Sequence, residues 1–184
     1  MSTLTVKNLQ GMAPSNQITV PSGHTLVAPG HVIQVVQTVY SSTASLSGSG
    51  STFRNFTGLD TTITPKASNS KFLIMYNLKV GSYQYSRRVV LKINGSYYNT
   101  GATDGYRSSS GSYYNVNASN MSDASYFEHT GEYLFSNSGT SSLAISFEIY
   151  NQDSNPVYIN RAYNYADTDR GLATSTLTVM EVAQ

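Results

Sequence analysis

The chain has 184 residues and a formal net charge of +1, with 11 Lys and Arg residues against 10 Asp and Glu residues. This balance provides no electrostatic field for capturing nucleic acid or anionic lipid. Because the chain contains no Cys, it cannot form a disulfide framework, a thiolate metal site or a cysteine nucleophile. No segment approaches the roughly 20 apolar residues of a membrane-spanning helix, so we expect no membrane insertion.

Residues 1–30 are predicted to form an extended N-terminal attachment arm. Its short apolar pieces are separated by turn-forming residues, and none is long enough to bury a face on its own. Such an arm gains order by packing on its own domain, on a neighbouring subunit or on a scaffold. The apolar pieces are Leu4–Val6, Ile18–Val20 and Leu26–Val27, and the turn residues are Pro14, Pro21–Gly23 and Pro29–Gly30.

The remaining residues, 31–184, are predicted to form one all-β domain. No window shows a sustained helical period. Short β-branched or alternating runs recur between turns instead, which indicates an antiparallel sandwich, jelly roll or barrel of roughly eight to ten strands. The runs are His31–Tyr40, Leu59–Thr64, Lys71–Val80, Tyr83–Ile93, Ser96–Tyr98, Ser125–Phe135, Ser141–Tyr150, Pro156–Asn160 and Thr174–Val182.

Several of these runs carry more specific signals. Lys71–Val80 and Ser141–Tyr150 alternate with the period of two that marks a strand with one packed face. Asn94-Gly95 lies between two β-rich runs and predicts a type I′ hairpin turn. We expect Ser125–Phe135 to form a strand–turn–strand or one bulged strand, and Pro156–Asn160 to form a short edge piece.

Basic residues occur singly except for Arg87-Arg88, which lies inside a predicted strand. We interpret this pair as solvated side chains on an edge strand, because charged residues protect such edges from further pairing. Residues 99–124 contain little aliphatic material for a core. They are expected to form either one long loop or an exposed hairpin.

The sequence offers no positive support for catalysis. The three histidines are His24, His31 and His129, and no Gly-x-Ser-x-Gly elbow is present to position a serine nucleophile. No phosphate-binding glycine loop and no dinucleotide fingerprint occur. We therefore expect a protein that is not an enzyme and needs no cofactor.

Two acidic constellations are weak candidates for chemistry. Glu128 and Glu132 would lie about 13 Å apart on a continuous strand, too far for a glycosidase pair, although a turn between them would shorten the distance. Asp167–Gly171 resembles the start of an EF-hand loop, but the glycine comes one position early and Thr178 stands where the loop needs Glu. A calcium site of another kind in this loop remains an alternative, and we predict no metal ligands.

The tyrosines form the one informative constellation, since 15 of them occur in the chain. Rigid amphipathic rings among Ser, Gly and Asn are typical of recognition surfaces, and tyrosine rings also stack on sugars. Interfaces between subunits enrich tyrosine for the same reasons, so packing between subunits is the alternative interpretation. The candidate ligand- or receptor-binding residues are Tyr97, Tyr98, Tyr106, Arg107, Tyr113 and Tyr114.

Two parts of the chain resemble virion surface proteins of tailed phages, especially marine and cyanobacterial ones. Leu4–Gly11, Ile18–Leu26 and Ala28–Val35 are similar to the segment that precedes the globular part in many such proteins. The body, through Leu59–Pro65, Ser70–Ile74 and Ser175–Val182, looks like the β knob of fibre and decoration proteins. The resemblance excludes residues 97–130. It implies a jelly-roll-like, trimeric knob that the arm attaches to the particle.

Together these features predict a structural protein of a tailed-phage virion. It would be a homotrimeric capsid decoration, cement or spike protein that docks on major capsid or tail proteins through residues 1–30. The alternative is a short tail fibre or a free carbohydrate-binding module that recognises a host surface glycan. The N-terminus lacks a basic region followed by an apolar run, so we expect synthesis in the host cytoplasm without a signal peptide and a final location on the virion surface.

Overall fold

The computed structural model describes residues 22, 28–82, 87–98, 112–114, 126–152, 154–163 and 172–184. These residues contain eleven β-strands and no helix, so no helix there could cross a membrane. The strands are β1 (Val32–Tyr40), β2 (Ala44–Leu46), β3 (Thr52–Ile63), β4 (Lys71–Ser82), β5 (Arg87–Ile93), β6 (Ser96–Tyr98), β7 (Ser112–Tyr114), β8 (Tyr126–Ser136), β9 (Leu143–Asn151), β10 (Val157–Ile159) and β11 (Ser175–Val182). The all-β prediction is confirmed.

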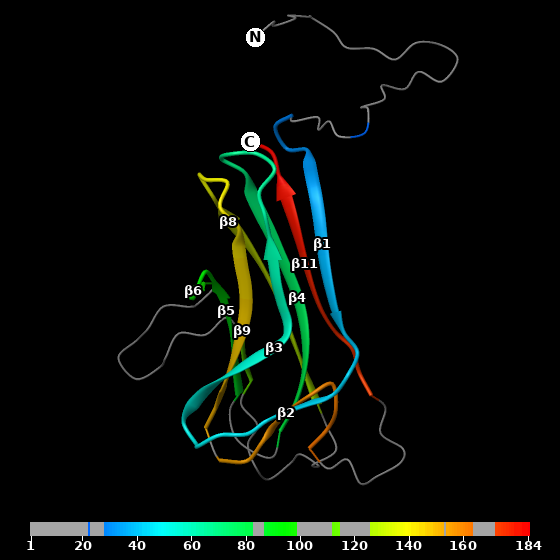
Figure 1. Cartoon of the computed structure of the whole chain (residues 1–184). Coiled ribbons are helices and arrows are strands. Elements are labelled where there is room, and N and C mark those ends of the chain that lie inside the picture. Colours follow the sequence, from blue (N-terminus) through cyan, green and yellow to red (C-terminus); the bar gives the residue numbers. More distant parts are fainter. Residues whose placement is uncertain are drawn as a thin grey trace, which may run out of the picture.

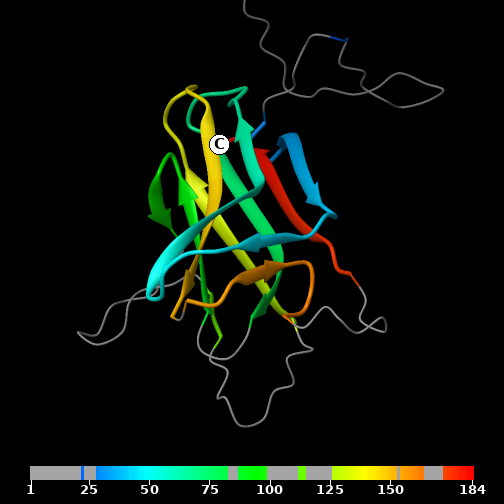
Figure 2. The same cartoon turned by 60° about the horizontal axis from the view of Figure 1, so that its bottom comes forward.

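The strands form two antiparallel sheets that pack face to face (Figures 1 and 2). In the first sheet, β11 lies between β1 and β4, and β8 pairs with the other edge of β4. Beyond β11, the short β10 continues along β4 and joins it to β2. In the second sheet, β9 lies between β3 and β5, while β6 and β7 share the far edge of β5.

The pairing has a nested order along the chain. The first long strand pairs with the last (β1 with β11), and β3 pairs with β9 inside that loop of chain. Further in, β4 pairs with β8, and β5 pairs with β6 and β7. The chain therefore behaves as one long antiparallel ribbon, folded over so that alternate strand pairs belong to opposite sheets.

The predicted alternation of side chains is confirmed in the central strands. On β4, the side chains of Phe72, Ile74, Tyr76, Leu78 and Val80 are all buried against the second sheet. The inward residues of β9 are buried in the same way, because a strand places successive side chains on opposite faces. These residues are Leu143, Ile145, Phe147 and Ile149.

Aromatic rings join the two sheets through the core. Tyr76 of β4 lies 4.9 Å from Phe147 of β9, measured between ring centroids. Gly131 of β8 is the direct neighbour of Tyr76, and a Cβ there would overlap the tyrosine ring. The missing side chain thus leaves room for the ring to reach the opposite sheet. Two further ring pairs cross between the sheets, Tyr40 with Phe56 and Tyr98 with Phe135.

The predicted Asn94-Gly95 hairpin is confirmed. Both residues have positive φ, 49° for Asn94 and 81° for Gly95, as a type I′ turn requires. The turn is also tied to the neighbouring strand, because the Asn94 amide donates to the Ala144 carbonyl and the Asn94 side chain accepts from the Ala144 amide.

A buried carboxylate organises the turn between β3 and β4. Glu181 of β11 is fully buried and accepts hydrogen bonds from the amides of Lys66 and Ala67, from the Ser70 hydroxyl and from the Gln34 side chain. Burial raises the pKa of Glu181, but these donors outweigh burial and hold the pKa below its ordinary value.

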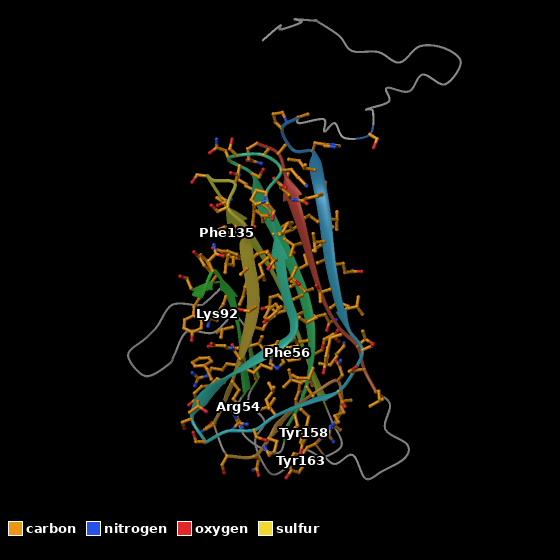
Figure 3. The ribbon with its side chains drawn as sticks, in the orientation of Figure 1. Arg54, Phe56, Lys92, Phe135, Tyr158 and Tyr163 are labelled. Carbon is orange, nitrogen blue, oxygen red and sulfur yellow. The ribbon has the colours of Figure 1, made fainter. Side chains whose placement is uncertain are left out.

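The buried guanidinium of Arg54 holds the Ser/Gly-rich segment before β3 in place through hydrogen bonds. Arg54 points into the sandwich and donates to the carbonyl oxygens of Leu46 at 2.7 Å, Gly48 at 2.9 Å and Asn155 at 2.8 Å. The figure with side chains places Arg54 at the end of the sandwich that carries Tyr158 and Tyr163 (Figure 3).

Three predictions about individual strands are wrong. Pro156–Asn160 is no edge piece, since β10 pairs on both sides and both Val157 and Ile159 are fully buried. Arg87-Arg88 does not lie on an edge strand either, because β5 pairs with β9 and with β6 and β7. Within Tyr126–Phe135, the described part of the predicted Ser125–Phe135 run, there is neither turn nor bulge, and β8 pairs with β4 in one unbroken register. Local sequence does not show which strands flank a given run, and this explains the first two errors. The third has another cause, because Gly131 does not form a turn but leaves room for the Tyr76 ring.

The predicted arm lies mostly outside the described residues. Of residues 1–30, the structure describes Ser22 and Ala28–Gly30. The Gly30 amide donates to the Ala183 carbonyl, and the Ala183 amide donates to the His31 carbonyl. The chain therefore joins the sandwich beside its own C-terminus (Figure 1).

Stability is predicted to fall as the pH drops from 6.5 toward 4, because of His129. Burial lowers the pKa of His129 from 6.5 to about 4, so in this window the unfolded chain binds a proton that the folded chain excludes. The free energy of unfolding should decrease by about 3 kcal/mol across the window. Urea unfolding at several pH values gives the free energy of unfolding of the wild type and of His129→Leu. If that free energy changed with pH equally in the two proteins, the assignment to His129 would be contradicted.

Candidate recognition surface

The two adjacent tyrosines of β6 face opposite sides of the second sheet. Tyr97 points outward and is 51% exposed. Tyr98 is half-buried and packs inward, with its ring 5.3 Å from Phe135 and 5.7 Å from Tyr133 on β8. Of the predicted binding residues, Tyr97 is therefore available to a ligand, whereas Tyr98 contributes to packing between the sheets.

Hairpin geometry could have separated these two residues. A two-residue turn at Asn94-Gly95 pairs Lys92 with Tyr97 and Leu91 with Tyr98. Cross-strand partners share a face of the sheet. Since an aliphatic residue such as Leu91 belongs in the core and a lysine does not, the sequence already implied that Tyr98 points inward.

A hydrogen-bonded triad of side chains lies on the outer face around Tyr97. The Tyr97 hydroxyl donates to Oε2 of Glu148 at 2.6 Å, and Nζ of Lys92 lies 2.7 Å from Oε1. Lys92 comes from β5, Tyr97 from β6 and Glu148 from β9, so the register of three strands brings them together.

The triad is electrostatically matched. Burial raises the pKa of Glu148, but the hydrogen bonds from Lys92 and Tyr97 outweigh it and hold the pKa below its ordinary value. The hydrogen bond to Glu148 in turn raises the pKa of Tyr97. At neutral pH the site therefore presents a carboxylate, an ammonium group and a neutral phenol, each with further hydrogen-bonding capacity.

Aromatic rings extend the triad across the sheet. The Phe53 ring, from β3, lies 5.7 Å from Tyr97 and 5.3 Å from Tyr150, centroid to centroid. The Arg88 guanidinium lies 4.5 Å from the centroid of Tyr150. Because β9 and β5 separate β3 from β6 in the sheet, the Phe53 and Tyr97 rings meet above these two strands. We call this set the aromatic face: Phe53, Arg88, Lys92, Tyr97, Glu148 and Tyr150.

The other predicted binding residues are only partly placed. Tyr113 and Tyr114 belong to β7, where their backbones pair with Arg88 and Arg87 of β5. The strand that carries Tyr113 thus lies on the same edge of β5 as β6. Tyr106 and Arg107 lie outside the described residues.

Sequence reasoning missed most of the aromatic face. The alternation of Ser141–Tyr150 puts Glu148 and Tyr150 on the same face of their strand, but nothing in the sequence links them to Tyr97. Phe53 lies in a stretch that was assigned to no strand, because β3 begins at Thr52 rather than at Leu59. The missing information is strand register, which depends on pairing between distant segments.

The acidic pair on β8 does not form a glycosidase arrangement. Glu128 and Glu132 are exposed on the outer face of one continuous strand, which separates them by about 13 Å. Glu128 is also held by Lys79 and by the Asn77 side chain, and the hydrogen bond from Lys79 lowers its pKa most. A carboxyl group with a lowered pKa does not suit the role of a general acid at neutral pH.

Metal-binding residues do not gather in the described part of the chain. Within it, no group of three or more His, Asp or Glu side chains is placed to hold an ion. The calcium-like segment Asp167–Gly171 lies outside the described residues.

No protein-family model matches this chain, and a search of curated proteins finds no match. A function must therefore be argued from the fold and from the surfaces themselves.

Replacing each of the two β6 tyrosines with alanine should have unequal effects on stability. Tyr98→Ala removes a ring that joins the sheets and should lower the free energy of unfolding by about 3 kcal/mol. Tyr97→Ala removes a surface hydrogen bond and should cost about 1 kcal/mol or less. Chemical denaturation measures both, with Tyr98→Phe as a control that keeps the packing. Equal losses for the two alanine variants would contradict the assigned faces.

Proposed function

We propose that this chain is a structural protein of a tailed-phage virion, a homotrimeric capsid decoration, cement or spike protein attached through residues 1–30. The observation that carries the proposal is the nested strand pairing. The strands form the antiparallel sheets β1–β11–β4–β8 and β3–β9–β5–β6/β7. This nesting supports a jelly-roll-like arrangement, and jelly rolls recur in viral capsid and lectin domains. Major capsid or tail proteins would be its partners.

Two further features support this proposal. The fold by itself does not determine function, but the sequence resembles phage surface proteins in both the arm and the body. In addition, the chain enters the sandwich at the end where the C-terminus lies, leaving the end with Tyr158 and Tyr163 on the far side (Figure 3). An arm docked at the first end would turn the other end and the side faces away from the particle.

Deleting residues 1–27 should abolish binding to phage particles while leaving the sandwich folded. The deletion keeps Ala28–Gly30, because the Gly30 amide is bonded to the Ala183 carbonyl. Co-sedimentation with particles measures binding, and thermal unfolding checks the fold. Undiminished binding of the shortened chain would refute docking through the arm, and a full-length chain that binds no phage particle would refute the virion role.

A second candidate function is recognition of a host surface glycan by the aromatic face. The specific observation is that two exposed rings, Phe53 at 39% and Tyr97 at 51%, adjoin the Lys92–Glu148 pair. Ring faces can stack on the apolar face of a sugar, while carboxylate and ammonium groups bond its hydroxyls. This function is compatible with a spike or tail-fibre role and also with a free carbohydrate-binding module.

Replacing both Phe53 and Tyr97 with alanine should abolish glycan binding. Both rings are partly exposed, so the variant should remain folded. Tyr158→Ala, which removes a tyrosine outside the aromatic face, serves as the matched control and should bind like the wild type. A broad glycan array measures binding. The absence of any glycan bound by the wild type, or equal binding by the double variant, would exclude this function for the aromatic face.

A further inference from the structure

The outer face of the first sheet carries an apolar row that crosses all four long strands. Val35 of β1 pairs with Met180 of β11, which pairs with Leu73 of β4, which pairs with Leu134 of β8. Direct cross-strand partners share a face, so these four side chains form one line across the sheet. The two at its ends are open to solvent, with Val35 54% and Leu134 52% exposed.

Neighbouring rows widen this apolar line. Val32 and its partner Val182 adjoin it on one side, and Met75 adjoins it on the other. Val39 lies one row beyond Met75, and three polar side chains share the row of Met75: Gln37, Thr178 and Glu132. Val32 is 41% and Val39 55% exposed. Most of the large apolar side chains that are exposed among the described residues thus gather on this face. We call it the β1–β8 face: Val32, Val35, Val39, Leu73, Met75, Leu134, Met180 and Val182.

Apart from the rings of the aromatic face, the outward side chains of the second sheet are largely polar. Asn55, Thr62, Ser146 and the Lys92–Glu148 pair occupy its outward positions. That is the usual pattern for an antiparallel sheet with one face in water. The β1–β8 face breaks the pattern within the same domain, and a large contiguous apolar patch marks an interaction site.

The charged side chains that the structure describes on the outer face of the first sheet lie at its ends and on its edge strand β8. Lys79 and Glu128 form an ion pair beyond one end of it, and Lys71 lies at the other end of β4. Glu132 lies on β8, the outermost strand. An apolar centre within a charged rim is the anatomy of a protein interface, and interfaces between identical chains have the more apolar centres.

With the polar positions between its apolar residues included, the face approaches the dimensions of a stable interface. Four strands spaced about 4.8 Å apart, over about seven residues of 3.3 Å each, cover roughly 20 Å by 25 Å. Projecting side chains raise the accessible area above this flat value, toward the about 800 Å² that each partner buries in a standard interface. Strand β1 borders the face, and among the described residues it pairs only with β11, so its free edge can extend the contact.

We propose that the β1–β8 face is buried against further copies of this chain, so that it is the surface through which the protein forms its homo-oligomer. Residues close to a rotation axis meet their own copies, so like charges there would repel, and the centre of this face holds no charge. The proposal deepens the homotrimer of the proposed function and rests on it for the number of copies. It also leaves the aromatic face, on the opposite side of the sandwich, open to a ligand.

Light scattering of the full-length chain tests the proposal with lysine substitutions at the two ends of the apolar row. The wild type should have the mass of at least two copies of the 20.0 kDa chain. Val35→Lys and Leu134→Lys should each weaken self-association by at least about ten-fold, the effect of one buried charge left without a partner. Thr62→Lys, at an exposed position on the other outer face, is the matched control and should keep the wild-type mass.

Circular dichroism must show that each variant retains the β fold, and exposed strand positions accept lysine without unfolding. A wild type that stays monomeric at high concentration overturns the proposal, as does an oligomer whose mass neither lysine variant changes. A monomer that nevertheless binds phage particles would assign the face to a capsid or tail protein. An oligomer that depends on the face but binds no particle would instead refute only the virion role.

Discussion

Strand β4 is hydrogen-bonded along both edges, to β8 on one side and to β11 and β10 on the other. It is therefore the central strand of the first sheet, and its inward side chains pack against the second sheet. Its inward side chains fill the middle of the sandwich, where Tyr76 meets Phe147 of the opposite sheet. That contact depends on Gly131, because a side chain there would occupy the position of the ring. Both outer faces are thereby held at fixed positions on either side of one core.

Two buried charges hold the ends of this sandwich without forming an ion pair. Arg54 is satisfied by carbonyl oxygens and Glu181 by amide, hydroxyl and side-chain amide donors. Carbonyl groups of β2 and of neighbouring loops thus compensate Arg54, and two loop amides together with two side chains compensate Glu181. These hydrogen bonds fix the backbone conformation of the two loops, which their amino-acid composition alone does not determine.

The two outer faces differ in chemistry although the same core supports them. One carries a matched polar triad beside exposed rings, and the other carries an apolar row from Val35 to Leu134. Alternation along each strand determines which residues point outward. The register between strands then determines which of these outward residues become neighbours. Single valines in an outward position are ordinary, whereas four apolar neighbours in a line are not.

The sequence by itself determined the all-β class, the inward faces of β4 and β9 and the Asn94-Gly95 hairpin, because a period of two and turn chemistry are local properties. Through that hairpin it also implied the opposite directions of Tyr97 and Tyr98. Only the tertiary structure decided that β5 and β10 are internal strands, and that Glu148 and Phe53 meet Tyr97. The reason is that the register between segments 44 and 51 residues apart depends on how the whole ribbon folds over, which no single segment encodes.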